Sequence, residues 1–440
     1  MHLFKWVPNH LWVAASSWAT RGVSASVQIV SVHYLLAILG EEKYSVFILL
    51  SGLAIWCSLS DFGIGNSILN FISERKAQNR QYSHLIIAAT LLMLIVCLLL
   101  IIFLYFISTF MAGVYLKAYS YQLLNNKTEL FFIATVIFCI TTTSNLIYKI
   151  WYAEHIGWLS NLYTAISALL GLLGIYLTSI LNSKINNLFD IFVIFFSPAL
   201  IISFSLLLFR FKKEFSNLKT VSKALFLISS KKIIQRARPF FIFAIMGTIV
   251  LQTDLIVLSQ KGTVKEIILY GVLLRVFNVV YFTYSAVLQA WWPVCTELRV
   301  KKQWIALKKN IRFTVMLGAI AILFLTLVIF FLQDFIFSIL GLNNIPKGSF
   351  ALFALFSLYF IIRAWCDTYA VLLQTIGNMK PLFIIVPIQA VINILLQWYL
   401  VSELSLIGIL LGSIISFGLT VAIYLPYKFN QLIKKDIQKQ

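Results

Sequence analysis

The sequence is poor in charged side chains, and poorest in acids. Only 11% of its 440 residues are Asp, Glu, Lys or Arg, whereas 61% are apolar, and 15 acids stand against 35 Lys and Arg. A soluble globular protein has about a quarter of its residues charged, because its surface faces water. This composition excludes a soluble globule and indicates a polytopic membrane protein.

Cysteines and the motifs of common enzymes are also scarce. The five cysteines are odd in number and fall inside apolar segments, where we expect them to act as small packing residues. The sequence contains no Gly-rich phosphate loop ending in Lys-Ser or Lys-Thr, no His-Glu-x-x-His and no cysteine–histidine cluster. We therefore expect no catalytic residues, no cofactor, no resident metal and no ATP hydrolysis.

Long apolar runs dominate the chain. A bilayer core about 30 Å thick requires about 20 apolar residues per helix, and twelve segments reach that length. They lie near 11–38, 44–72, 83–110, 128–152, 156–181, 188–209, 240–260, 266–295, 311–333, 349–377, 381–401 and 404–427. These unbroken runs lack the alternation of a transmembrane barrel strand, so the sequence predicts an all-α bundle of twelve transmembrane helices.

Residues 210–238 form the one long hydrophilic stretch, with nine Lys or Arg and a single acid, Glu214. Six predicted spans precede it and six follow, which predicts an N-terminal lobe at 1–209 and a C-terminal lobe with a short tail at 239–440. Placing both termini in the cytoplasm puts most Lys and Arg on that side, as the positive-inside rule requires. The net charge therefore encodes orientation rather than nucleic-acid binding, with anionic-lipid contact or regulation as alternative roles for the stretch.

The two halves repeat one plan. Gln28 lies 16 residues before Tyr44, and Gln252 lies 18 residues before Tyr270. Both halves start on the same side of the membrane, so the sequence predicts parallel repeats related by an axis along the membrane normal. We expect a central cavity between the lobes.

Three arginines, Arg21, Arg275 and Arg363, fall inside predicted spans. An Arg at the bilayer centre costs about 2.5 to 3.5 kcal/mol on insertion scales, so each needs a partner or a polar cavity. Arg363 and Asp367 stand one turn apart and fit an internal ion pair, whereas the helices of Arg21 and Arg275 offer no nearby acid. Alternatively, the three line the cavity and bind an anion, since guanidinium groups suit phosphate oxygens.

Acids in the spans suggest two further roles. An acid in a cavity can take up and release a proton as its Arg partner leaves, so Asp254 and Asp367 are the candidate coupling acids. Asp61 lies near the inner end of the second span, where we expect a helix-end or gating contact.

Several motifs resemble those of a known family. The Leu39-Gly40-x-x-x-Tyr44 turn, the Asp61-x-Gly63-Ile64 end of the second span and Arg21 resemble the O-antigen and polysaccharide-repeat flippases (Wzx type). These belong to the multidrug, oligosaccharidyl-lipid and polysaccharide exporter superfamily, which also contains the lipid II flippase. Ser45 departs from the Gly that usually follows the Tyr, although Gly271 keeps it in the second half.

The resemblance implies a flippase that moves a polyprenyl-diphosphate-linked oligosaccharide between leaflets of the bacterial inner membrane by alternating access, driven by H⁺ or Na⁺. The three arginines would hold the diphosphate. Other cavity side chains would contact the sugars: Gln28, Asn278, Gln289, Gln389 and Asn393. A polysaccharide polymerase and its chain-length machinery would be further partners.

Two other functions stay open. A multidrug or cation exporter of the same superfamily would need a site dominated by acids, which three central arginines disfavour. A membrane-embedded glycosyltransferase or polysaccharide polymerase would need a large hydrophilic loop outside, whereas the longest loop here is predicted to face inward.

Overall fold

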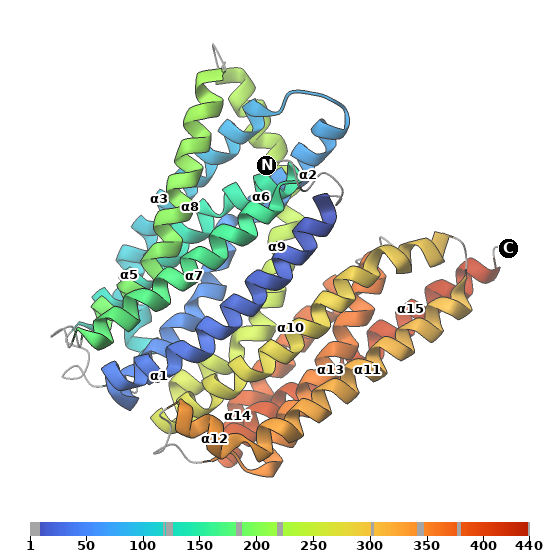
Figure 1. Ribbon diagram of the computed structural model, residues 1–440. Coiled ribbons are helices and arrows are strands. Elements are labelled where there is room, and N and C mark those ends of the chain that lie inside the picture. Colours follow the sequence, from blue (N-terminus) through green and yellow to red (C-terminus); the bar gives the residue numbers. More distant parts are fainter. Residues whose placement is uncertain are drawn as a thin grey trace. The chain divides into compact units, whose positions relative to one another are not determined.

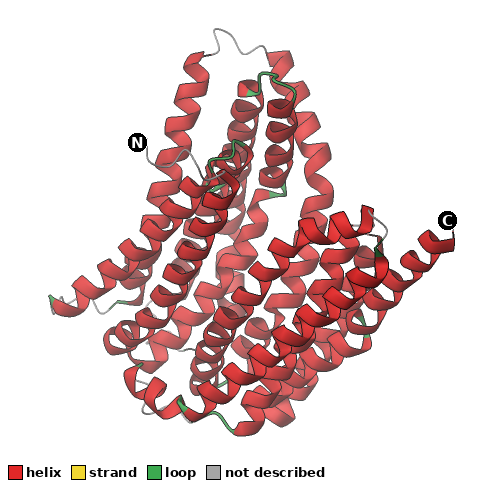
Figure 2. Ribbon diagram, turned by 45° about the vertical axis from the view of Figure 1, so that its right-hand side comes forward, coloured by secondary structure: helices red, strands yellow, loops and turns green. Residues whose placement is uncertain are grey.

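The computed structural model describes residues 9–117, 119, 126–181, 187–217, 223–300, 303–340, 347–375 and 380–438, with the side chains of most of 282–300 left out. These residues form helices joined by short loops (Figure 1; Figure 2). They divide into two compact units, Met1–Thr248 and Ile249–Gln440.

The first unit holds the helices of the first six predicted spans. In Figure 1, α1 lies beside α7, and α3 lies beside α5 and α8. The elements are α1 (Asn9–Cys57), η1 (Ser58–Asp61), α2 (Ile64–Ala77), α3 (Ser83–Tyr115), α5 (Lys127–Ser144), α6 (Leu146–Ala153), α7 (Gly157–Ile180), α8 (Leu188–Asn217) and most of α9 (Lys223–Lys261). Buried aromatic rings fill the space between α1, α5 and α8, with Phe138 and Phe196 4.9 Å apart.

The second unit holds the other six spans. It starts within α9 and continues with α10 (Val264–Val300), α11 (Trp304–Phe331), α12 (Gln333–Ile339), α13 (Phe350–Thr375), α14 (Lys380–Leu419) and α15 (Val421–Gln438). α13 packs against α10, α11, α14 and α15 and so forms the centre of the unit. Stacked rings join it to α10, where Phe277 lies 5.1 Å from Phe356 and 5.6 Å from Phe360.

Two long helices are broken where the sequence predicts a turn between spans. α1 bends at Gly40, whose φ of 71° suits a residue without a Cβ. α14 bends at Ser405, whose φ is 55°. The Ser405 hydroxyl donates a hydrogen bond to Glu266, which holds this strained backbone in place. Each broken helix therefore supplies two membrane crossings.

All twelve predicted spans correspond to helices. Nine helical stretches among the described residues are long and apolar enough to cross a membrane, including Ser16–Asp61 with 46 residues and Lys380–Lys434 with 55. At about 1.5 Å per residue, each of these two is long enough to cross twice. α10, with 37 residues, is the predicted eighth span. The predicted all-α polytopic fold is confirmed.

The basic stretch 210–238 is helical wherever it is described, and it lies within the first unit. α8 continues to Asn217, and α9 packs on α2 through Ile233, whose carbonyl accepts a 3.0 Å hydrogen bond from Ser67. Arg236 donates to both carboxylate oxygens of Glu74 at 2.5 and 2.8 Å, and this hydrogen bonding lowers the pKa of Glu74. The two compact units divide inside α9, at 248–249.

Candidate substrate and ion-coupling site

Arg363 stands at the centre of a polar cluster in the second unit. Its guanidinium carbon lies 4.4 Å from the centroid of the Tyr281 ring, and its Nε lies 3.8 Å from Oδ2 of Asp367. The Tyr281 hydroxyl donates a hydrogen bond to that same carboxylate oxygen. Arginine and aspartate come from one face of α13, and the tyrosine comes from α10. The cation therefore rests on an aromatic face, and its ionic contact with Asp367 is long.

Asp254, on α9, is the second acid near this arginine. It is 9% exposed, its Oδ2 accepts a hydrogen bond from the Tyr270 hydroxyl, and its Oδ1 accepts one of 2.9 Å from the backbone N–H of Leu255. The charge of Arg363 acts on this carboxylate as well. Two acids of the second unit thus lie near one guanidinium.

The two amide side chains of α14 that were predicted to contact sugars are buried between helices. Asn393, 1% exposed, donates to the backbone carbonyl of Val250 at 3.3 Å and accepts from Ser416 at 3.1 Å. Gln389 is also buried, and its Nε2 has no hydrogen-bond partner among the described residues. In this conformation Asn393 therefore serves helix packing, whereas Gln389 retains an unused donor.

The remaining predicted contacts on α1 and α10 are more accessible. Gln28 is exposed, and Arg275 and Asn278 are half-buried on one face of α10. Gln289 lies outside the described side chains. Arg275 and Asn278 belong to the same unit as Arg363, whereas Gln28 belongs to the first unit.

Arg21 occupies a different polar cluster, between α1, α6 and α7 of the first unit. Its charge acts on Tyr152, whose hydroxyl donates a 2.6 Å hydrogen bond to Oδ1 of Asn161. The side-chain Nδ2 of Asn161 in turn donates to the Ser16 hydroxyl at 2.9 Å, and the backbone carbonyl of Asn161 accepts a hydrogen bond from the Thr20 hydroxyl at 2.8 Å. Arg21 is therefore set among neutral hydrogen-bonding groups on three helices.

Asp61 lies at a helix end. Its Oδ1 accepts a 2.5 Å hydrogen bond from the backbone N–H of Gly63, immediately before α2 begins. Gly63 has a φ of 75°, and a Cβ there would lie 2.5 Å from the carbonyl oxygen of Ala237. The carboxylate thus closes a turn that requires glycine, as expected of a helix-end contact.

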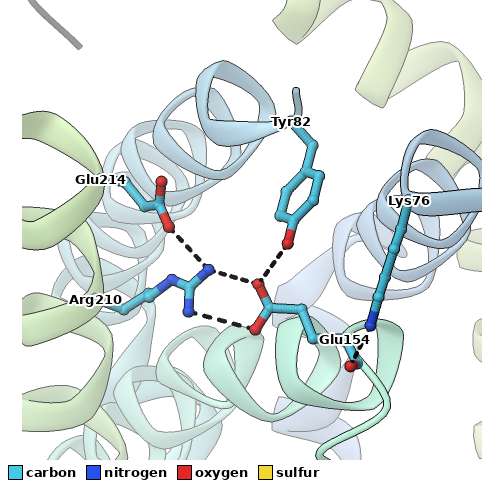
Figure 3. Close-up of polar contacts among 5 residues, drawn as sticks. All are labelled: Lys76, Tyr82, Glu154, Arg210 and Glu214. Atoms are coloured by element: carbon cyan, nitrogen blue, oxygen red, sulfur yellow. Dashed lines mark hydrogen bonds and ion pairs between the residues drawn. The ribbon is translucent and has the colours of Figure 1, made fainter. Parts of the chain in front are cut away.

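A separate ion cluster joins four elements of the first unit (Figure 3). Arg210 on α8 bridges Glu154, at 2.5 Å, and Glu214, at 2.8 Å. Tyr82, just before α3, donates to Glu154 at 3.1 Å, and Lys76 of α2 donates to the Glu154 backbone carbonyl at 2.5 Å. Burial raises the pKa of Tyr82, which keeps its hydroxyl a neutral donor.

The sequence resembles curated bacterial proteins along nearly its whole length. It is 41% identical over 434 residues to a protein of Salmonella typhi named as an O-antigen transporter, covering 97% of this chain and 98% of the relative. It is also 35% identical over 434 residues to a protein of Yersinia pseudotuberculosis named as an O-antigen export protein, covering 98% of each. The chain belongs to the O-antigen transporter family. No protein-family model matches it.

Solved structures show which fold this O-antigen transporter family member adopts. The lipid II flippase MurJ, in an inward closed conformation, matches with a TM-score of 0.69 and 14% identity over 96% of this chain and 87% of that one. An inward-facing multidrug transporter of the MATE family matches with a TM-score of 0.68 and 11% identity over 96% and 99%. The fold is therefore the two-lobed fold of the MOP transporter superfamily. The relatives are transporters rather than enzymes, as expected.

The sequence of this O-antigen transporter family member did not reveal two tyrosines that donate hydrogen bonds to Asp254 and Asp367. Tyr270 served only to mark the internal repeat, and Tyr281 was not singled out at all. Both lie on α10, the helix that carries Arg275 and Asn278. Arg275 and Asn278 on this helix were already assigned to the site. Tyr270 and Tyr281 could have been identified from the sequence because they share that helix.

Proposed function

We propose that the protein translocates a polyprenyl-diphosphate-linked oligosaccharide, an O-antigen-type repeat unit, from the inner to the outer leaflet of the bacterial inner membrane. Full-length similarity to O-antigen transporters is the observation that carries this proposal. Alternating access of two lobes suits the fold, since no covalent step is needed to move an intact lipid. Both termini would lie in the cytoplasm, where the positive-inside rule puts 210–238.

The buried cationic groups suit the diphosphate of such a substrate. Arg363 presents a planar set of N–H donors, and its Nε has no hydrogen-bond partner among the described residues. Phosphate oxygens accept two such donors at once, and the guanidinium stays charged at any physiological pH. Arg275 on the neighbouring helix would add a second cation.

Reconstitution tests the transport step. In vesicles containing the purified protein, a fluorescent polyprenyl-diphosphate oligosaccharide placed in one leaflet should become accessible to a quencher on the other side. Vesicles without protein give the background, because a sugar headgroup crosses a bilayer slowly. Movement of an organic cation dye without the lipid would support a multidrug exporter instead, and lengthening of the oligosaccharide would support a polymerase.

We further propose that Asp254 and Asp367 couple transport to an ion gradient, because both carboxylates lie near the guanidinium of Arg363. Replacing both by Asn should remove the response of transport to an imposed H⁺ or Na⁺ gradient, while the lipid still equilibrates slowly between leaflets. Imposing each gradient separately identifies the ion.

The matched control for this substitution is Asp334→Asn. Asp334 lies in the same unit, but it is 66% exposed and pairs with Lys347 at 2.7 Å. The Asp334→Asn variant should leave the response of transport to the ion gradient unchanged. An undiminished response in the Asp254→Asn, Asp367→Asn double variant would place coupling elsewhere.

A further inference from the structure

Tyr281 of α10 makes two contacts with α13, one to each member of the Arg363–Asp367 pair. Its hydroxyl donates a hydrogen bond to Oδ2 of Asp367, and its ring faces the guanidinium, whose carbon lies 4.4 Å from the ring centroid. Oδ2 is also the oxygen that lies 3.8 Å from Nε of Arg363. The tyrosine hydroxyl and the guanidinium therefore face the same carboxylate oxygen.

The hydroxyl binds this oxygen closely, whereas the guanidinium does not. A hydrogen bond between an arginine and a carboxylate is about 2.7 to 2.9 Å long, and residues four apart on one helix are neighbours that can form it. Here the Arg363–Asp367 distance is 3.8 Å, and Nε of Arg363 has no hydrogen-bond partner among the described residues. Arg363 thus lies beside an acid while at least one of its donors stays unused.

The second acid near Arg363 is held in the same way. The Tyr270 hydroxyl, also on α10, donates a hydrogen bond to Oδ2 of Asp254. Tyr270 and Tyr281 are about three helical turns apart, which places them on one face of α10. This face therefore supplies each acid with a neutral donor, because a tyrosine hydroxyl keeps its proton at physiological pH.

We propose that Tyr281 is a positioning residue that holds Asp367 away from Arg363 and so keeps the guanidinium open for the substrate diphosphate. This inference rests on the proposed function. Without the hydroxyl, Oδ2 would pair with Arg363 one helical turn away, and a diphosphate would have to displace that carboxylate. The side chains of Asp367 and Arg363 are 44% and 17% exposed, so a headgroup can approach the pair.

Tyr281→Phe tests this role because it removes the hydroxyl and keeps the ring. The ring centroid lies 5.7 Å from that of Phe360 and 6.3 Å from that of Tyr284, and this packing should preserve the contact with Arg363. The purified full-length variant should bind geranylgeranyl diphosphate, a polyprenyl diphosphate without sugars, about tenfold more weakly than the wild type, the effect of one charge-assisted hydrogen bond. Adding Asp367→Asn should recover most of the lost affinity, because an amide has no charge with which to compete.

Tyr284→Phe is the matched control for the lost hydroxyl. The Tyr284 hydroxyl lies on the same helix, but its 2.6 Å hydrogen bond joins it to the uncharged Thr368 hydroxyl. The affinity of this variant for geranylgeranyl diphosphate should stay within about twofold of wild type. If Asp367→Asn does not restore binding to Tyr281→Phe, the hydroxyl only joins α10 to α13 and the proposal is wrong.

A measurement without ligand separates the role of Tyr281 from the proposed function. In a double-mutant cycle on the heat-unfolding midpoint, Arg363→Gln and Asp367→Asn should be coupled more strongly in the Tyr281→Phe background than in the wild type, because the two charges then pair. Stronger coupling in a protein that does not bind geranylgeranyl diphosphate would support the role of Tyr281 and count against the diphosphate site. Unchanged coupling would overturn the role of Tyr281, whatever the protein binds.

Discussion

Replacing Arg363 by Ala is expected to reduce transport of the lipid-linked oligosaccharide at least about tenfold, because a charge-assisted hydrogen bond contributes about 1.5 to 3 kcal/mol. Folded protein should stay near the wild-type level. Asp367 is 44% exposed, so it keeps water as a partner when the guanidinium is gone. The buried Asp254 can be neutralised by a proton. The lost contact with the Tyr281 ring should cost about 1 kcal/mol of stability.

Two further variants separate anion binding from structural pairing. Arg363→Lys keeps the positive charge but loses the planar fork that stacks on Tyr281, so transport should be rescued only in part. Arg312→Ala removes an exposed arginine from α11 of the same unit and should leave transport unchanged. The measurement is transport per folded protein in vesicles. Normal transport by Arg363→Ala would exclude a diphosphate contact there, and a matching loss of folded protein would identify a structural pair.

Hydrophobic length and helical spacing were enough to predict the fold and part of this cluster. The twelve apolar runs need about 20 residues each to satisfy their backbone groups in lipid, so length alone identifies the helices. A separation of four residues on one helix puts Arg363 beside Asp367 whatever surrounds them. Both inferences depend on local chain geometry, which the sequence carries directly.

Contacts between helices could not be predicted from length and spacing, because these contacts depend on how each helix is rotated about its axis. The family resemblance implied that Asn393 contacts sugars in a cavity, whereas in this structure its amide bonds the Val250 carbonyl of α9 and the Ser416 hydroxyl. Likewise, nothing in the spacing of Tyr281 indicates that it donates to Asp367 of another helix. A polar face in a membrane helix can turn toward a cavity or toward a neighbouring helix, and composition alone does not separate the two.

The second large effect is expected for Arg210→Ala. Arg210 neutralises Glu154 and Glu214, whose side chains are 10% and 7% exposed. Removing the arginine leaves two carboxylates close together with little water and no guanidinium between them. Breaking a buried pair in this way typically costs about 3 to 5 kcal/mol, and we expect the lower end because Arg210 is 18% exposed. The heat-unfolding midpoint of the purified protein should fall clearly.

A charge-free version of the cluster tests this explanation. In the triple variant Arg210→Met, Glu154→Gln, Glu214→Gln no charge is stranded, so most of the lost stability should return. Arg238→Ala is the single-site control, because Arg238 is exposed and makes no ion pair with a described residue. Its effect on the free energy of unfolding should stay within about 0.5 kcal/mol. If the triple variant is as unstable as Arg210→Ala, then Arg210 stabilises the unit by packing its side chain between α6 and α8 rather than by balancing the two acids.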